Sequence, residues 1–238
     1  MIFFKTVAII FFNLIDKFIH QKKILYFFKK KNININTWLD IGSHKGLYTD
    51  LIKKNFNLKK GYLFEPQKNI FKFIKHKYKS NKKINTYNFA VSDSKKIRKI
   101  YINKHDLTST LTKINENNFY LKLKAKLFGG SIKEMITDYY NIKTIKLSNF
   151  LKQKKIKEVD LIKIDTEGHE LNVLIGVEKE IKNIRYILIE FHNNKIYQNY
   201  NSSKVHRYLI KNNFELKKKI KFPFTEWEDR IYMNKNFN

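Results

Sequence analysis

The fold is decided by a stretch near the beginning of the chain that reads Trp38-Leu39-Asp40-Ile41-Gly42-Ser43-His44-Lys45-Gly46-Leu47-Tyr48. An apolar run that ends in Asp-x-Gly and leads into a helical pattern predicts a strand, a tight turn and the start of a helix. Glycine allows backbone N–H groups in such a turn to approach a ligand, because it has no Cβ. The dinucleotide fingerprint G-x-G-x-x-G would require glycine at His44, so a nicotinamide site is disfavoured. Either the turn binds another nucleotide-like cofactor, or it is only a tight connection.

The alternation of strand and helix patterns continues along the chain. Strands are predicted at 35–41, 61–65, 84–91, 159–165 and 186–192, with an antiparallel closing pair at 214–220 and 230–234. Helices are expected from Gly46 to about Asn55 and after Glu65, Gly168 and Tyr200. This order predicts an α/β domain with a mostly parallel sheet. Residues 92–150 are less regular, with a turn at Gly129-Gly130 and a strand at 139–147, and we interpret them as a substrate-facing insertion.

Composition narrows the class of protein. The chain has 238 residues, 42% of them hydrophobic, which is enough for one packed core. Its formal net charge is +28, yet only four of the 49 basic residues are arginine, the residue suited to bidentate phosphate recognition. We therefore attribute the lysine excess to A/T-rich codons rather than to a polyanion site. The chain has no cysteine, so disulfides and thiolate metal sites are excluded.

The first 33 residues form a segment of their own. Apolar residues recur at helical spacing over residues 2–30, which predicts an N-terminal helical arm (1–33) before the main domain (34–238). We expect the arm to pack on the domain or on a partner. The alternative is an in-plane membrane anchor, because lysines flank its aromatic residues. The apolar stretch is too short to span a bilayer and no signal-cleavage site follows it, so we expect a cytoplasmic protein, with peripheral membrane contact as the alternative.

An acidic residue at the end of the second strand supports the cofactor interpretation. Glu65 follows the apolar run Gly61-Tyr62-Leu63-Phe64 and stands 25 residues after Asp40. A carboxylate at this place can accept hydrogen bonds from ribose hydroxyls. The alternative is a helix-start charge stabilised by the helix dipole.

Two later strands end in titratable residues. Asp165 and Glu167 follow the strand at 159–165, and Glu190 and His192 share one face of the strand at 186–192. Ligands of open α/β sheets bind beyond the carboxyl ends of the strands, so these four side chains could meet in one cleft. Helix capping remains the alternative for Asp165, Glu167 and Glu170.

Taken in order, five motifs resemble one family. They are Asp-Ile-Gly-Ser-His-x-Gly at 40–46, Phe-Glu-Pro at 64–66, Ala-Val-Ser-Asp at 90–93, Lys-Ile-Asp-x-Glu-Gly-x-Glu at 163–170 and Ile-Glu-x-His at 189–192. Together they resemble the FkbM family of S-adenosylmethionine-dependent methyltransferases, over about residues 37–192 and more weakly to 232. The N-terminal arm has no counterpart in this pattern.

The resemblance implies a Rossmann-like class I methyltransferase fold, a seven-stranded sheet with helices on both faces and an antiparallel final strand. It also implies an S-adenosylmethionine site in which Asp40, Gly42, Ser43 and Gly46 line the methionine and ribose end. Glu65 would hold the ribose hydroxyls, and the loop at Ala90, Val91 and Ser92 would border the adenine. The acceptor would be a hydroxyl of a sugar, glycan or other small metabolite.

Methyl transfer to a hydroxyl requires a base for its proton. We name His192 and Asp165 as candidates for the base and Glu167 and Glu190 as orienting groups. Mg²⁺ bound by the same cluster is a less favoured alternative, so no metal is assigned. Two rival functions are disfavoured. Methylation of nucleic-acid bases would call for an Asp/Asn/Ser-Pro-Pro-aromatic motif, where this chain reads Asp-Thr-Glu-Gly at 165–168. Binding of RNA or anionic lipid without catalysis would be opposed by acidic strand ends that repel phosphate.

Overall fold

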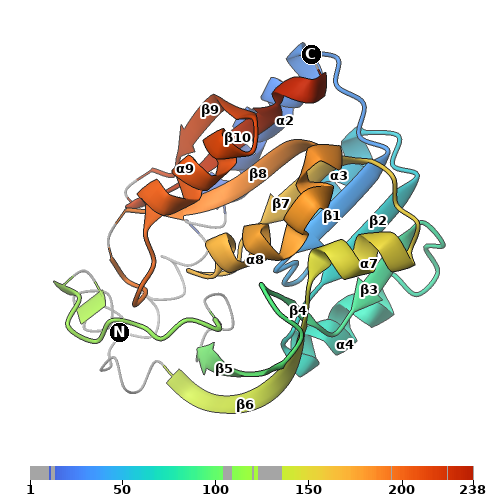
Figure 1. Ribbon diagram of the computed structural model, residues 1–238. Coiled ribbons are helices and arrows are strands. Elements are labelled where there is room, and N and C mark those ends of the chain that lie inside the picture. The colour runs from blue at the N-terminus through green and yellow to red at the C-terminus, as the bar shows by residue number, and fades with distance from the viewer. Residues whose placement is uncertain are drawn as a thin grey trace.

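A seven-stranded sheet forms the centre of the molecule in the computed structural model (Figure 1). The structure describes residues 11, 14–103, 109–119, 121–122, 136–193, 195–223 and 225–237. The strands stand in the order β3-β2-β1-β7-β8-β10-β9. Their bounds are β1 Thr37–Ile41, β2 Lys60–Phe64, β3 Ile84–Tyr87, β7 Val159–Ile164, β8 Ile184–His192, β9 Phe214–Lys221 and β10 Trp227–Asn234.

The central strands are parallel and the last one is reversed. β1 pairs in parallel with β2 and β7, and β8 continues the parallel array beside β7. Only β10 runs against its neighbours, pairing antiparallel with both β8 and β9 among the strands of this sheet that the structure describes. The predicted seven-stranded, mostly parallel sheet with an antiparallel final strand is confirmed. Its switch point lies between β1 and β7, where a ligand is expected in a doubly wound sheet.

Helices cover both faces of the sheet (Figure 1). One apolar cluster joins the sheet to α7 (Leu147–Gln153), α8 (Glu170–Val177) and α9 (Ser202–Lys211). A second cluster on the opposite face joins it to α2 (Gln21–Lys30), α3 (Leu47–Asn55) and α4 (Lys68–Lys77). Two 3₁₀ turns follow α8 and β10 along the chain, namely η2 (Glu178–Asn183) and η3 (Lys235–Phe237). Both faces of the parallel strands are therefore buried, as their near-continuous apolar sequences require.

A smaller sheet lies beside the main one (Figure 1). It holds β4 (Ala90–Val91), β6 (Ile136–Ile145) and β5 (Ile97–Asn103) in that order. The prediction of one strand over 84–91 was wrong, because β3 and β4 belong to different sheets. Asn88 lies between the two strands, and its side-chain Nδ2 donates to the carbonyl oxygens of Glu65 and Pro66 at 2.9 and 3.0 Å. The predicted strand at 139–147 is present as β6, and the predicted Gly129-Gly130 turn lies outside the described residues.

The described part of the N-terminal arm packs on the sheet. A π-helical turn, η1 (Asp16–His20), leads into α2, and the face of α2 that carries Ile24 and Phe28 is buried against Tyr186 and its neighbours. The Nε2 atom of His20, itself fully buried, lies 2.9 Å from Oδ2 of Asp229. Residues 1–10, 12 and 13, which belong to the predicted helix, lie outside the described residues. Within the described part of the chain, none of the helices has the length and apolar character needed to cross a membrane.

Candidate active site

The glycine turn after β1 has the backbone shape that the sequence suggested. Gly42 and Gly46 adopt positive φ values of 79° and 74°. The N–H groups of Gly42 and Ser43 donate to the carbonyl oxygen of Phe64 at 3.0 and 3.1 Å, which joins the turn to the end of β2. A Cβ at Gly42 would overlap the carbonyl oxygen of Asp165, and one at Gly46 would overlap Tyr78. Both glycines are thus required by the backbone conformation and by packing within the protein.

A pocket opens at the carboxyl ends of β1, β2 and β7. Its volume is about 970 Å³, counting the open solvent at its mouth. It is lined by six of the seven residues predicted to bind the cofactor, namely Asp40, Gly42, Ser43, Glu65, Ala90 and Val91. Gly46 is not in the lining, because it lies behind the turn against Tyr78. Asp165 and Glu167 also line the pocket, whereas Glu190 and His192 lie behind them.

Asp40, at the end of β1, is held from one side only. Its Oδ2 accepts a 2.7 Å hydrogen bond from the hydroxyl of Thr49, which in turn accepts one from the indole of Trp38. Its Oδ1 and the Oγ of Ser43 are buried and have no hydrogen-bond partner among the described residues. Burial raises the pKa of Asp40 to about 6. A ligand with hydroxyl or ammonium groups would satisfy both atoms.

Glu65 bridges the glycine turn and the start of α4. It is 2% exposed, and its two carboxylate oxygens accept the N–H groups of His44 and Gln67, both at 2.8 Å. Burial raises the pKa of Glu65 to about 7, although both backbone hydrogen bonds favour the ionised form. Glu65 therefore also stabilises the start of α4, which was the alternative expectation for this residue. The side chain of Gln67 also hydrogen-bonds to this carboxylate, so about one of its four acceptor positions is left for a ligand in the pocket that it lines.

A buried lysine fixes Asp165 beyond the end of β7. Nζ of Lys163 lies 2.6 Å from Oδ2 of Asp165 and 4.5 Å from the centre of the Tyr48 ring. Burial alone would raise the pKa of Asp165, but the charge and hydrogen bond of Lys163 outweigh it, so the pKa is lowered. Asp165 is thus an ionised carboxylate at the wall of the pocket.

The other three predicted catalytic residues come together next to Asp165. The Nε2 atom of His192 lies 3.1 Å from Oε2 of Glu190 and 3.7 Å from Oε2 of Glu167. The hydroxyl of Tyr197 donates a short hydrogen bond to the same oxygen of Glu167. Burial, reinforced by the charge of Glu190, raises the pKa of Glu167 to about 8. Burial and the charge of Asp165 raise the pKa of Glu190 well above its usual range.

Helix capping explains the position of Glu170, but not that of Asp165 or Glu167. Oε1 of Glu170 accepts the backbone N–H groups of Thr166 and Gly168 at 3.0 and 3.1 Å, which closes the turn before α8. The side chains of Asp165 and Glu167 instead contact Lys163 and Tyr197. Glu167 itself has a positive φ of 54°, an uncommon conformation for a residue with a side chain.

Sequence reasoning assigned no role to Lys163, Tyr197 or Asp229. For Lys163 a signal was present, because a lone charge within an apolar strand must find a partner when that strand is buried. Asp229 lies opposite Glu190 in the antiparallel register of β10 and β8, and its Oδ2 accepts a hydrogen bond from the hydroxyl of Tyr48 at 3.1 Å. Tyr197 follows the end of β8 by five residues, and nothing in the sequence marked it.

Two solved structures of other proteins share this fold. A crystal structure of a Streptococcus pneumoniae putative tRNA (m1A22) methyltransferase, in complex with S-adenosyl-L-methionine, is 12% identical, with a TM-score of 0.50 over 89% of this chain and 72% of the other. The structure of methyltransferase FkbM from Methylobacillus flagellatus is also 12% identical, with a TM-score of 0.52 over 84% of this chain. Both likenesses show a Rossmann-like fold.

The family follows from a direct sequence match. The methyltransferase FkbM domain matches residues 40–216, most of the chain, and the protein belongs to this family. Hexuronic acid methyltransferase AglP of Haloferax volcanii is 31% identical over 51 residues, which is 21% of each chain. The protein spans 43% of the length of the Methylobacillus FkbM structure. The predicted family, and with it the methyltransferase class, is thereby confirmed, while the cofactor, the acceptor and the residue roles are matters of proposal.

Proposed function

We propose that the protein transfers a methyl group from S-adenosylmethionine to a hydroxyl of a sugar, glycan or other small metabolite. The observation that carries this proposal is the joining of the glycine-turn pocket to a cluster of Asp165, Glu167, Glu190 and His192. The bound cofactor supplies a methyl group on a sulfonium, so the S–C bond breaks as the O–C bond forms and the hydroxyl proton leaves. The cluster provides groups that can take this proton.

The residues of the pocket suit this cofactor. Asp40 and Glu65 place two buried carboxyl groups in it, and Asp40 Oδ1 and Ser43 Oγ lack partners within the described part of the chain. Such a lining favours hydroxyl and ammonium groups and disfavours the pyrophosphate of a dinucleotide. We assign Glu65 to the ribose hydroxyls, Asp40, Gly42 and Ser43 to the methionine and ribose end, and Ala90 and Val91 to the adenine. Gly46 acts indirectly, by shaping the turn.

Two residues are candidates for the proton acceptor. His192 offers an imidazole nitrogen, and Asp165 lines the pocket with a carboxylate whose pKa is lowered by Lys163. Glu167 joins the two, because it lines the pocket and lies 3.7 Å from His192. We assign Glu167 and Glu190 to orienting the acceptor and the base.

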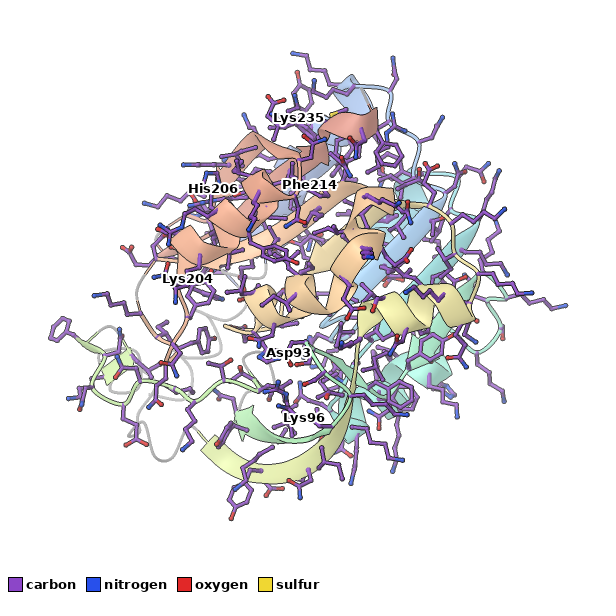
Figure 2. All side chains as sticks on the ribbon, viewed as in Figure 1. Asp93, Lys96, Lys204, His206, Phe214 and Lys235 are labelled. Carbon is purple, nitrogen blue, oxygen red and sulfur yellow. The ribbon has the colours of Figure 1, made fainter. Side chains whose placement is uncertain are left out.

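The chemistry of the site favours a sugar over a nucleic-acid acceptor. The chain is strongly basic overall, and nitrogen-tipped side chains project from many elements in Figure 2 rather than from one of them. No arginine is among the described residues that line the pocket, so the pocket lacks the side chain best suited to bidentate contact with a phosphate backbone. The short match to a hexuronic acid methyltransferase supports a sugar acceptor.

The test is transfer of labelled methyl from S-adenosylmethionine to a panel of hexose and hexuronic acid glycosides, with total tRNA as the rival acceptor. We expect label on a sugar in an alkali-stable ether. Mild alkali releases a methyl ester, so alkali-labile label would move the acceptor from hydroxyl to carboxylate. Label in tRNA alone would overturn the proposal.

A further inference from the structure

We propose that Glu167, Glu190 and His192 form a binding site for a divalent first-row transition-metal cation. One oxygen from each carboxylate and Nε2 of the imidazole lie within 4.8 Å of one another. The inference deepens the proposed function and rests on it for its catalytic meaning, because the cation would stand at the reaction end of the pocket.

The spacing of the donor atoms fits one ion. Nitrogen and carboxylate ligands lie about 2.1 Å from such a cation, so two ligands of the same ion stand about 3.0 to 3.4 Å apart in octahedral or tetrahedral geometry. Nε2 of His192 lies 3.1 Å from Oε2 of Glu190 and 3.7 Å from Oε2 of Glu167. Small side-chain rotations would bring all three into coordination.

Burial without hydrogen bonding is an independent indication of a missing ligand. His192 is 6% exposed and Glu190 is 8% exposed. Despite their short separation, Nε2 of the imidazole and Oε2 of Glu190 form no hydrogen bond with the described residues. Buried polar atoms without partners are costly, and a cation would satisfy both at once.

The surroundings hold the donors in place. Tyr197 donates a hydrogen bond to Glu167, and the rings of Tyr197 and Tyr200 pack edge-on against the imidazole with centroids 5.0 and 5.6 Å away. Such outer contacts orient metal ligands in proteins. The donor set, two carboxylates and one imidazole, suits Mn²⁺ or Zn²⁺ better than Mg²⁺, which prefers oxygen ligands and water.

The site would divide the catalytic roles. A cation lowers the pKa of a hydroxyl that approaches it. With Nε2 of His192 serving as a ligand, Asp165 would be the group left to take the hydroxyl proton while the methyl group passes from the sulfonium to the hydroxyl oxygen. Nζ of Lys163, 2.6 Å from Oδ2 of Asp165, holds this side chain in place.

The test is Mn²⁺ binding to the full chain, freed of metal with a chelator and followed by electron paramagnetic resonance. We expect one bound Mn²⁺ per chain and a nitrogen coupling from the imidazole in the pulsed spectrum. His192→Gln should remove the nitrogen coupling and weaken binding at least tenfold, and Glu190→Gln should weaken it to a similar degree. His206→Gln is the matched control, since His206 lies on α9 (labelled in Figure 2) and its Nδ1 lies 2.8 Å from the hydroxyl of Tyr232, which is not a member of the cluster.

Binding of S-adenosylhomocysteine, measured on the same samples, separates the two proposals and reports folding. Cofactor binding without Mn²⁺ binding in the wild type would overturn the metal site and leave the methyltransferase intact. Mn²⁺ binding without cofactor binding would overturn the proposed function. Unchanged Mn²⁺ affinity in both variants, absence of the nitrogen coupling in the wild type, or equal competition by Mg²⁺ would also refute this site.

Discussion

Replacing Glu65 with alanine tests the cofactor site at its most defined residue. In the structure each carboxylate oxygen accepts one backbone N–H at 2.8 Å, and the side chain of Gln67 is a third donor, which leaves about one acceptor position toward the pocket. A hydrogen bond to a charged group contributes about 1.5 to 3 kcal/mol. Loss of the ribose contacts should therefore weaken cofactor binding by ~1 to 3 kcal/mol, which is about 5- to 150-fold in affinity.

The assay is calorimetric titration with S-adenosylhomocysteine and with its 2′-deoxy analogue, against wild type and Glu65→Ala. Direct contact predicts that removing the ligand hydroxyl costs affinity in the wild type and much less in the variant. Glu215→Ala, an exposed carboxylate on β9, is the control. If the loss of the 2′-hydroxyl weakens binding by the same factor in the wild type and in Glu65→Ala, Glu65 only supports the glycine turn.

Four further predictions concern buried groups, the glycine turn and the N-terminal arm. Burial raises the pKa of Glu65 from 4.5 to about 7, so the ligand-free protein should be more stable at pH 5 than at pH 8, by ~3 kcal/mol of unfolding free energy. Thermal melts at the two pH values should show this difference, and it should be smaller in Glu65→Gln. Phe28→Ala, at a fully buried position of α2, should lower stability by ~3 to 4 kcal/mol and the melting temperature by roughly 10 °C, and an unchanged melting temperature would mean that the arm is not docked. Deleting residues 1–30 should lower the melting temperature or the solubility in the same way and leave sedimentation with anionic vesicles unaffected, whereas loss of vesicle binding with stability intact would favour the membrane alternative. Gly46→Ala should weaken both stability and cofactor binding, because φ is 74° and the new Cβ would overlap Tyr78; a neutral result by melting and calorimetry would contradict the turn geometry.

The sequence predicted most of the main sheet because its signals are local. Apolar runs and the Asp-x-Gly turn marked β1, β2, β7 and β8 within a few residues of their observed bounds. The break between β3 and β4 was missed, because it depends on Asn88 reaching the carbonyl groups of another loop.

The site was predictable only where residues follow strand ends. The two-residue period placed Glu190 and His192 on one face of β8, and the strand-end rule brought Asp165 and Glu167 toward them. The pairing of Asp165 with Lys163 joins two residues of one strand end and could have been expected from their two-residue spacing, whereas the contact of Glu167 with Tyr197 depends on packing between separate segments. No spacing within the chain reveals a contact of the second kind, so the hydrogen bond from Tyr197 became visible only in the folded structure.

Native mass spectrometry of the purified protein reports whether the glycine-turn pocket holds the cofactor. We expect a bound mass of S-adenosylmethionine or S-adenosylhomocysteine, or its uptake at one molecule per chain when it is added, and its loss in Asp40→Ala and Glu65→Ala variants that melt cooperatively. A folded wild-type protein that takes up neither molecule, or variants that bind as tightly as wild type, would contradict the assignment of this pocket to the cofactor.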